Sequence, residues 1–216
     1  MSESDDVPYK YVDLNNWPQP HTHAIGQITL EWNEIEREFE RLVCLYIETD
    51  QPTARIITGI FGNRDKSELL TQLVSLKESS PDISDAVDYA KSLFHICREN
   101  RNHIAHSTVQ LAEELHKITL KKPRKQNPLE DHELELDINQ VRECSRDIWR
   151  ARRYIRDLNR QISIALTDRQ LAQQSFGDGD RSDASPPLSL PQKPPKPRKL
   201  SAFLQIVPNI DQPPPE

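Results

Sequence analysis

Three polar residues near the end of one predicted helix have the chemistry to bind a phosphate and to move protons: Arg101, Asn102 and His106. The apolar residues between Ile83 and Ala105 recur as on an amphipathic helix, and Arg101 lies in the middle of their stripe. A guanidinium cannot lose its proton, and burying it without a partner costs several kcal/mol. The sequence therefore predicts either that the helix ends before Arg101, or that Arg101 meets an anion or lines a cleft.

A polar line of candidate supporting groups lies one face over on the same predicted helix. His95, Glu99 and His103 follow one another at intervals of four residues, a spacing that also suits metal ligands. A di-metal bundle, however, needs matched acidic ligands and Glu-x-x-His pairs on facing helices. Only Glu113–His116 has that spacing, and it lies off this helix. We therefore expect a solvated polar face here, with no metal and no other cofactor.

The string Arg101-Asn102-x-x-x-His106, near the end of a long helix, resembles the motif of the HEPN superfamily of nucleotide-binding and ribonuclease domains. The resemblance covers roughly residues 23–166. It implies a four-helix bundle that acts as an endoribonuclease, with two motifs facing each other across a homodimer interface. It also implies a role as a toxin or defence effector, with an antitoxin or other protein as partner. Some members carry a modified tyrosine where Thr108 stands, so that regulation is not implied.

The chemistry that the resemblance implies needs no metal, because RNA carries its own nucleophile, the 2′-hydroxyl. His106, with an ordinary pKa of about 6.5, could take the 2′-hydroxyl proton or protonate the leaving 5′-oxygen. Arg101 would hold the phosphate, and Asn102 could orient the imidazole or the sugar. The products would be a 2′,3′-cyclic phosphate and a 5′-hydroxyl end. Arg101 and His106 lie about 140° apart on a straight helix, so they can face the same way only if the helix ends between them.

Other interpretations of the motif stay open. Arg101 could form a salt bridge to a carboxylate such as Glu36 or Glu48, and His106 could be a helix-end histidine bonded to a carbonyl. The chain would then be a helical scaffold whose motif is a coincidence. A further alternative is a non-catalytic HEPN-like module that binds RNA, a nucleotide or a protein partner.

Two groups of basic residues are candidates for RNA contact, although rows of arginines are more often solvated faces paired with acids. The first group lies in or beside a predicted hairpin loop: Lys121, Lys122, Arg124 and Lys125. The second forms one ridge on the last predicted helix: Arg142, Arg146, Arg153, Arg156 and Arg160.

The hydrophobic pattern predicts an all-α fold, a four-helix bundle with a small β-hairpin before the last helix. Apolar residues spaced by seven mark the first and the last helix as bundle-forming. The predicted helices span residues 23–49, 66–78, 83–107 and 137–166, with a short helical turn within 50–62. The hairpin pairs residues 116–122 with 133–137 across a long basic loop at 123–132.

Composition divides the chain into three parts. Hydrophobic residues make up 35% of the 216 residues and the mean hydropathy is −0.74, low values that indicate disorder in part of the chain. Residues 1–22 are predicted to be an irregular arm and residues 23–166 the helical bundle. Residues 167–216 are rich in proline and basic residues, and they are predicted to be a disordered tail. Within the tail, Leu200–Val207 is a short apolar stretch that could dock on the domain.

Charge and cysteine content indicate which partners and which cellular compartment to expect for the protein. The net charge of −6 argues against general coating of nucleic acid and leaves only local basic patches. No apolar run is long enough to span a membrane, and the acidic start of the chain does not resemble a signal peptide. The three cysteines are far apart in the sequence and lack metal-site spacing. We therefore expect a cytoplasmic protein without disulfides.

Overall fold

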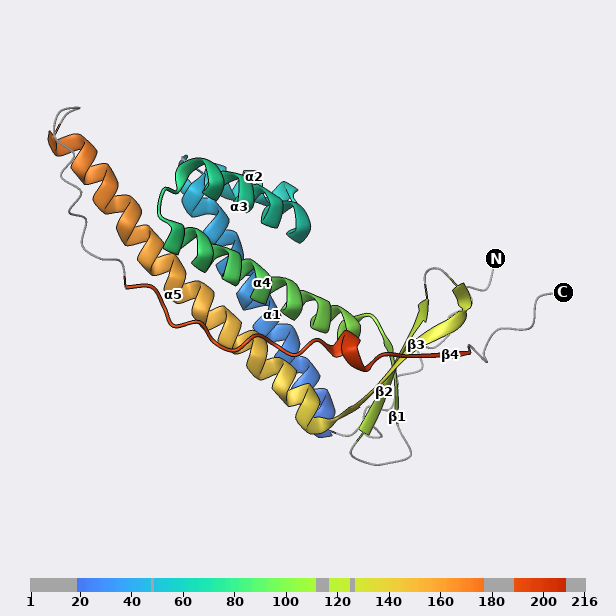
Figure 1. Ribbon diagram of the computed structural model, residues 1–216. Coiled ribbons are helices and arrows are strands. Elements are labelled where there is room, and N and C mark those ends of the chain that lie inside the picture. The colour runs from blue at the N-terminus through green and yellow to red at the C-terminus, as the bar shows by residue number, and fades with distance from the viewer. Residues whose placement is uncertain (1–18, 48, 112–116, 125–126, 177–188, 209–216) are drawn as a thin grey trace, which may run out of the picture.

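A computed structural model describes residues 19–47, 49–111, 117–124, 127–176 and 189–208. Long helices form the body of the described part, and a small antiparallel sheet lies at one end of it (Figure 1). The helices are α1 (Gln19–Tyr46), α2 (Gln51–Ile60), α3 (Asn63–Lys77), α4 (Pro81–Ala105), α5 (Ile138–Phe176) and the short 3₁₀ helix η3 (Leu200–Phe203). The strands are β1 (Thr108–Leu111), β2 (Lys117–Arg124), β3 (Asn127–Asp137) and β4 (Gln205–Pro208).

The hydrophobic core lies where α1, α4 and α5 pack against one another. The residues that we predicted to line the faces of α1 are all buried: Ile28, Trp32, Ile35, Phe39, Leu42 and Tyr46. On α5 the apolar residues spaced by seven are also buried, apart from the half-buried Ala165. At the centre, the rings of Phe39 and Phe94 stack with centroids 4.0 Å apart, and Trp32 lies 5.2 Å from Phe94. Each such fully buried side chain contributes about 1.5–3 kcal/mol.

Side-chain caps set where several helices begin. The Asp50 carboxylate accepts a hydrogen bond from the Thr53 backbone N–H at 3.0 Å at the start of α2. At the start of α4, the Ser80 hydroxyl accepts from the Ile83 N–H at 3.4 Å. At the start of α5, the Asp137 carboxylate accepts from the N–H groups of the first helical turn. These bonds satisfy backbone donors that the first turn of a helix cannot pair internally.

The sheet is larger than the predicted hairpin. Its four strands lie in the order β1-β2-β3-β4, and every neighbouring pair is antiparallel. The predicted long loop at 123–132 is wrong, because β2 continues to Arg124 and β3 begins at Asn127. The polar half of β3, Glu130–Glu133, pairs with β4 on its other side. A partner strand on both edges holds residues 131–133 in a strand, although they show no apolar alternation.

The first and last helices extend beyond their predicted limits. Helix α1 begins at Gln19, inside the predicted arm, and residues 1–18 lie outside the described part. Helix α5 runs ten residues past its predicted end at Leu166, to Phe176. The Arg169 guanidinium in this extension makes two hydrogen bonds, of 2.8 and 3.3 Å, to the buried Glu78 carboxylate after α3. This contact between distant parts of the sequence stabilises the extra turns.

Part of the predicted disordered tail packs against the domain, and we call residues 189–208 the C-terminal strap. It runs along α4, from the Lys193–Asp85 ion pair to Asn100, and supplies η3 and β4 (Figure 1). The Asn100 side chain of α4 donates to the Arg198 carbonyl at 2.8 Å and accepts from the Leu200 N–H at 2.9 Å. Leu200 is buried, so the predicted docking of the apolar stretch is confirmed. Residues 177–188 and 209–216 lie outside the described part.

The coarse prediction of a mainly helical fold with a small antiparallel sheet is therefore confirmed. The three cysteines are free. Cys97 and Cys144 are buried, and burial raises the pKa of the Cys144 thiol to about 12, so it behaves as a small apolar residue. Within the described ranges, every helix is too short or too polar to cross a bilayer.

Candidate functional site

The end of α4 brings the Arg101 and His106 side chains together. The helix ends at Ala105, and His106 caps it with its N–H bonded to the Asn102 carbonyl at 3.2 Å. Because the chain leaves the helix here, the two side chains are no longer held about 140° apart. Arg101 Nη1 lies 3.3 Å from His106 Nε2, and it also donates to Asn102 Oδ1 at 3.1 Å. All three predicted catalytic residues thus form one connected group.

The surroundings of Arg101 leave its charge without a carboxylate partner among the described residues. The side chain is half-buried, and its Cζ atom lies 6.0 Å from the centroid of the Trp32 ring. Its Nε is buried and makes no hydrogen bond within the described part. The alternative partner Glu36 accepts instead from the Asn63 amide, and Glu48 lies outside the described residues. A guanidinium in this state retains donors for an anionic ligand.

A small polar cavity adjoins this group. Its volume is about 350 Å³, within the size range of small-ligand sites. It is lined by His95, Arg98, Glu99, Asn102, His103 and Lys122. Asn102 therefore links the cavity to Arg101 and His106. The cavity also gathers the three predicted supporting residues and one of the predicted RNA-binding lysines.

The two cavity histidines favour their neutral form. His95 Nε2 lies 2.9 Å from the Ser67 hydroxyl of α3, and burial, with Arg98 and Lys91 nearby, lowers the pKa of His95. Burial also lowers the pKa of His103, with the positive charge of Lys122 and the nearby His132 acting in the same direction and Glu99 opposing them. Neutral imidazoles can both donate and accept hydrogen bonds, as a polar ligand in the cavity would require.

These shifts predict that the protein loses stability as the pH falls. The unfolded chain, in which each histidine has a pKa of about 6.5, binds protons more readily than the folded chain. The stability is therefore complete above that pH and falls as the pH drops toward the lowered pKa values. Urea unfolding at about pH 7.5 and about pH 5.5 should show a smaller decline for the H95Q/H103Q variant than for the wild type. Equal declines would contradict this expectation.

The predicted RNA-binding residues of the hairpin do not all lie at one site in the structure. Lys122 lines the cavity, whereas the Lys121 ammonium lies 3.5 Å from the Glu133 carboxylate across the strand pair. The Arg124 backbone pairs with Asn127 in the sheet, and Lys125 lies outside the described residues. Of the four basic residues that we predicted to bind RNA, Lys122 is therefore the one that lines this cavity.

Two residues of the site were missed by sequence reasoning. Arg98 lines the cavity one turn before Asn102, and Ser67 contacts His95 from another helix. Arg98 could have been found, because it lies three and four residues from other predicted members of the same helix face. Ser67 carries no sequence signal, since only the packing of α3 against α4 brings it to His95.

The described residues offer no cluster of three or more His, Cys, Asp or Glu side chains that could hold a metal ion. The Glu113–His116 pair lies outside the described residues. In the cavity, Arg98 and Lys122 place two positive charges beside the histidines. That lining suits an anionic ligand better than a cation.

Comparison of the chain with family models, with curated proteins and with solved structures gives no match. The functional interpretation therefore depends on the residues and the geometry of this site.

Proposed function

We propose that this protein is a metal-independent endoribonuclease of the HEPN type. The observation that carries the proposal is the contact between Arg101 and His106, 3.3 Å apart at the end of α4. A permanent cation that lacks a carboxylate partner among the described residues lies beside an exposed imidazole. Phosphate binding and proton transfer, the two functions that RNA cleavage needs, are thus available at one point.

The proposed reaction uses the 2′-hydroxyl of the substrate as the nucleophile. Arg101 binds the scissile phosphate and offsets the negative charge that builds on its oxygens. His106 accepts the 2′-hydroxyl proton as the new O–P bond forms, or protonates the 5′-oxygen as the old bond breaks. Asn102, bonded to Arg101, fixes the guanidinium relative to the imidazole. The products are a 2′,3′-cyclic phosphate and a 5′-hydroxyl end.

The proposal includes a two-fold homodimer with a composite site. One exposed histidine per chain can serve as base or as acid, and a second copy facing it supplies the other group. The HEPN resemblance also suggests a cytoplasmic toxin or defence effector, restrained by an antitoxin or another protein partner. In such a system the protein would cleave RNA in the cell when the partner is lost.

A non-catalytic RNA-binding or nucleotide-binding module is the second candidate. The cavity favours it, because Arg98 and Lys122 could bind a phosphate while neutral His95 and His103 bond to a base. Such a module would retain RNA without cutting it.

The test is incubation of the full purified chain with a mixed RNA pool in excess EDTA, followed by analysis of the ends. We expect fragments with 2′,3′-cyclic phosphates and 5′-hydroxyls, and no such fragments from the R101A variant. RNA that is retained but stays intact would favour the binding module. Cleavage that stops in EDTA, or that leaves 3′-hydroxyl ends, would contradict the proposed mechanism.

A further inference from the structure

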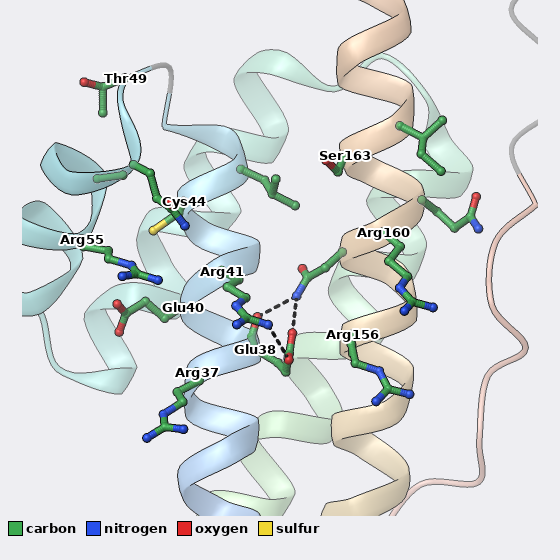
Figure 2. A pocket seen from close by; sticks show the side chains of 16 residues that line it. Arg37, Glu38, Glu40, Arg41, Cys44, Thr49, Arg55, Arg156, Arg160 and Ser163 are labelled. Atoms are coloured by element: carbon green, nitrogen blue, oxygen red, sulfur yellow. Dashed lines mark hydrogen bonds and ion pairs between the residues drawn. The ribbon is translucent and has the colours of Figure 1, made fainter.

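A second cavity, larger than the one beside Asn102, lies away from the proposed active site, and none of the three motif residues lines it. It is a groove of about 1220 Å³ between α1 and α5, with α2 along one side (Figure 2). Arg37 and Arg41 come from α1, Arg55 from α2, and two more arginines from α5 on the opposite side. We call this the arginine groove. Its lining contains five arginines and two glutamates, an excess of positive charge in a chain whose net charge is −6.

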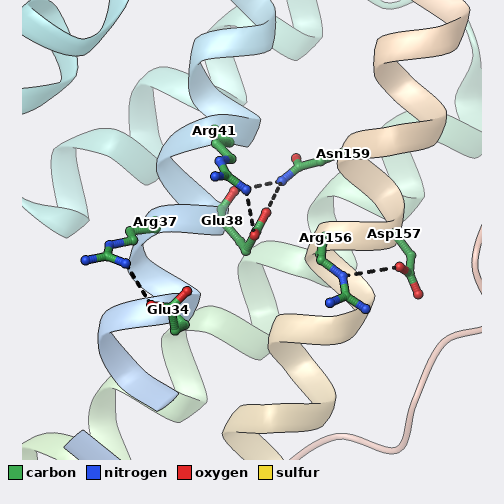
Figure 3. A network of polar contacts seen from close by, with 7 residues as sticks. All are labelled: Glu34, Arg37, Glu38, Arg41, Arg156, Asp157 and Asn159. Atoms are coloured by element: carbon green, nitrogen blue, oxygen red, sulfur yellow. Dashed lines mark hydrogen bonds and ion pairs between the residues drawn. The ribbon is translucent and has the colours of Figure 1, made fainter. Parts of the chain in front are cut away.

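Both glutamates of the arginine groove are already engaged. The buried Glu38 carboxylate accepts from Arg41 Nη1 at 2.9 Å and from the Asn159 amide of α5 at 3.2 Å (Figure 3). Glu40 pairs with Lys66 of α3 at 2.9 Å. The carboxylates therefore hold Arg41 and the walls of the groove in place, and they do not neutralise the remaining arginines.

The remaining arginines are only partly compensated. Arg37 pairs with Glu34 outside the groove at 2.8 Å, and Arg156 lies at 3.6 Å from its sequence neighbour Asp157 (Figure 3). Arg160 of α5 and Arg55 of α2 are both exposed, and neither forms an ion pair within the described residues. Exposed ion pairs contribute only about 0–1 kcal/mol, so a stronger anionic partner can replace them.

We infer that the arginine groove binds the phosphate backbone of single-stranded RNA, as a second contact surface for the proposed substrate. Guanidinium groups bind phosphate oxygens in pairs, and arginines from three helices suit a ligand with several phosphates better than one with a single charge. The exposed apolar surface of Ile164 in the same groove can lie against a ribose or a base. The inference rests on the proposed function for its choice of RNA as the polyanion.

The experiment measures RNA binding apart from cleavage. The full chain carrying H106A, which is expected to bind without cutting, is titrated into fluorescein-labelled oligouridine at several salt concentrations. We expect R55Q/R160Q in this background to bind more weakly and to lower the slope of log K against log salt by about 1.4, or 0.7 per lost phosphate contact. The matched control R64Q/K196Q removes the same charge from exposed basic residues outside the groove and outside both predicted RNA-contact groups, and its slope should equal that of H106A alone.

Each outcome bears on the inference. Equal losses in the two double variants would show an effect of net charge alone and would overturn it, as would no loss in R55Q/R160Q or no binding of oligouridine. Equal binding of a polyglutamate peptide would show that the groove selects negative charge rather than RNA, and would also overturn it. Groove-dependent binding without any cleavage by the wild type would support the arginine groove and count against the proposed activity.

Discussion

Replacing His106 by alanine is expected to slow RNA cleavage by about 10²- to 10⁴-fold, the usual contribution of a positioned acid or base. The side chain is exposed and caps α4 through its backbone N–H, which alanine retains, so the fold should not change. The measurement is the initial rate of cleavage in EDTA, with urea unfolding as the check on folding. The matched control is H23A, which removes another exposed histidine, on α1.

The cleavage rates of the variants show whether His106 acts in catalysis or only in the structure. If H106A and H23A cleave at the same rate, His106 moves no proton and the proposed mechanism fails. If H103A instead shows the large loss, the reacting phosphate lies in the cavity and not at the Arg101–His106 contact.

Truncating the contacts of the C-terminal strap is expected to cause a large loss of stability. Leu200 is 6% exposed, and L200A should cost about 2–5 kcal/mol through lost burial and the cavity left behind. N100A leaves the Arg198 carbonyl and the Leu200 N–H without their partner, at a cost of about 1–3 kcal/mol for each group that stays buried. Urea unfolding of the full chain gives both values, because unfolding free energies can be compared between variants of one chain.

Hydrogen exchange shows where the stability is lost. We expect L200A and N100A to lose amide protection first in the strap and in β3, which pairs with β4. The control I206A changes an exposed side chain of β4 and should alter the unfolding free energy by less than about 0.5 kcal/mol. Wild-type stability and wild-type protection in N100A would show that Asn100 does not hold the strap.

The helical core could be predicted from the sequence because its signal is local. The seven-residue spacing on α1 and α5 identifies buried faces wherever those faces end up packing, and the caps Ser80 and Asp137 identify helix starts. The strap could not be predicted in this way. Its proline-rich composition indicates disorder, and the amide that holds part of it, on Asn100, lies about a hundred residues earlier in the sequence.

In the candidate site, too, the features with a local sequence signal could be predicted and the contacts between distant residues could not. Arg101 was identifiable because a charged residue interrupts an apolar stripe, and the meeting of Arg101 with His106 follows from where α4 ends. The arrival of Lys122 beside Asn102 depends on how β2 lies against α4, which helix periodicity cannot predict. The arginine groove likewise needs the parallel packing of α1 against α5, in which Arg152 meets Glu31 and Asn159 meets Glu38, although the α5 arginines were recognised as a ridge.

The most direct test of the central claim is a single 2′-deoxy substitution in an RNA oligonucleotide, placed on the 5′ side of a bond that the protein cleaves. Because the proposed nucleophile is that one hydroxyl, activated at the contact between Arg101 and His106, we expect binding to persist and cleavage at that bond to stop. If the substituted bond is cleaved as fast as the same bond in unmodified RNA, another nucleophile attacks, and the proposed mechanism is contradicted.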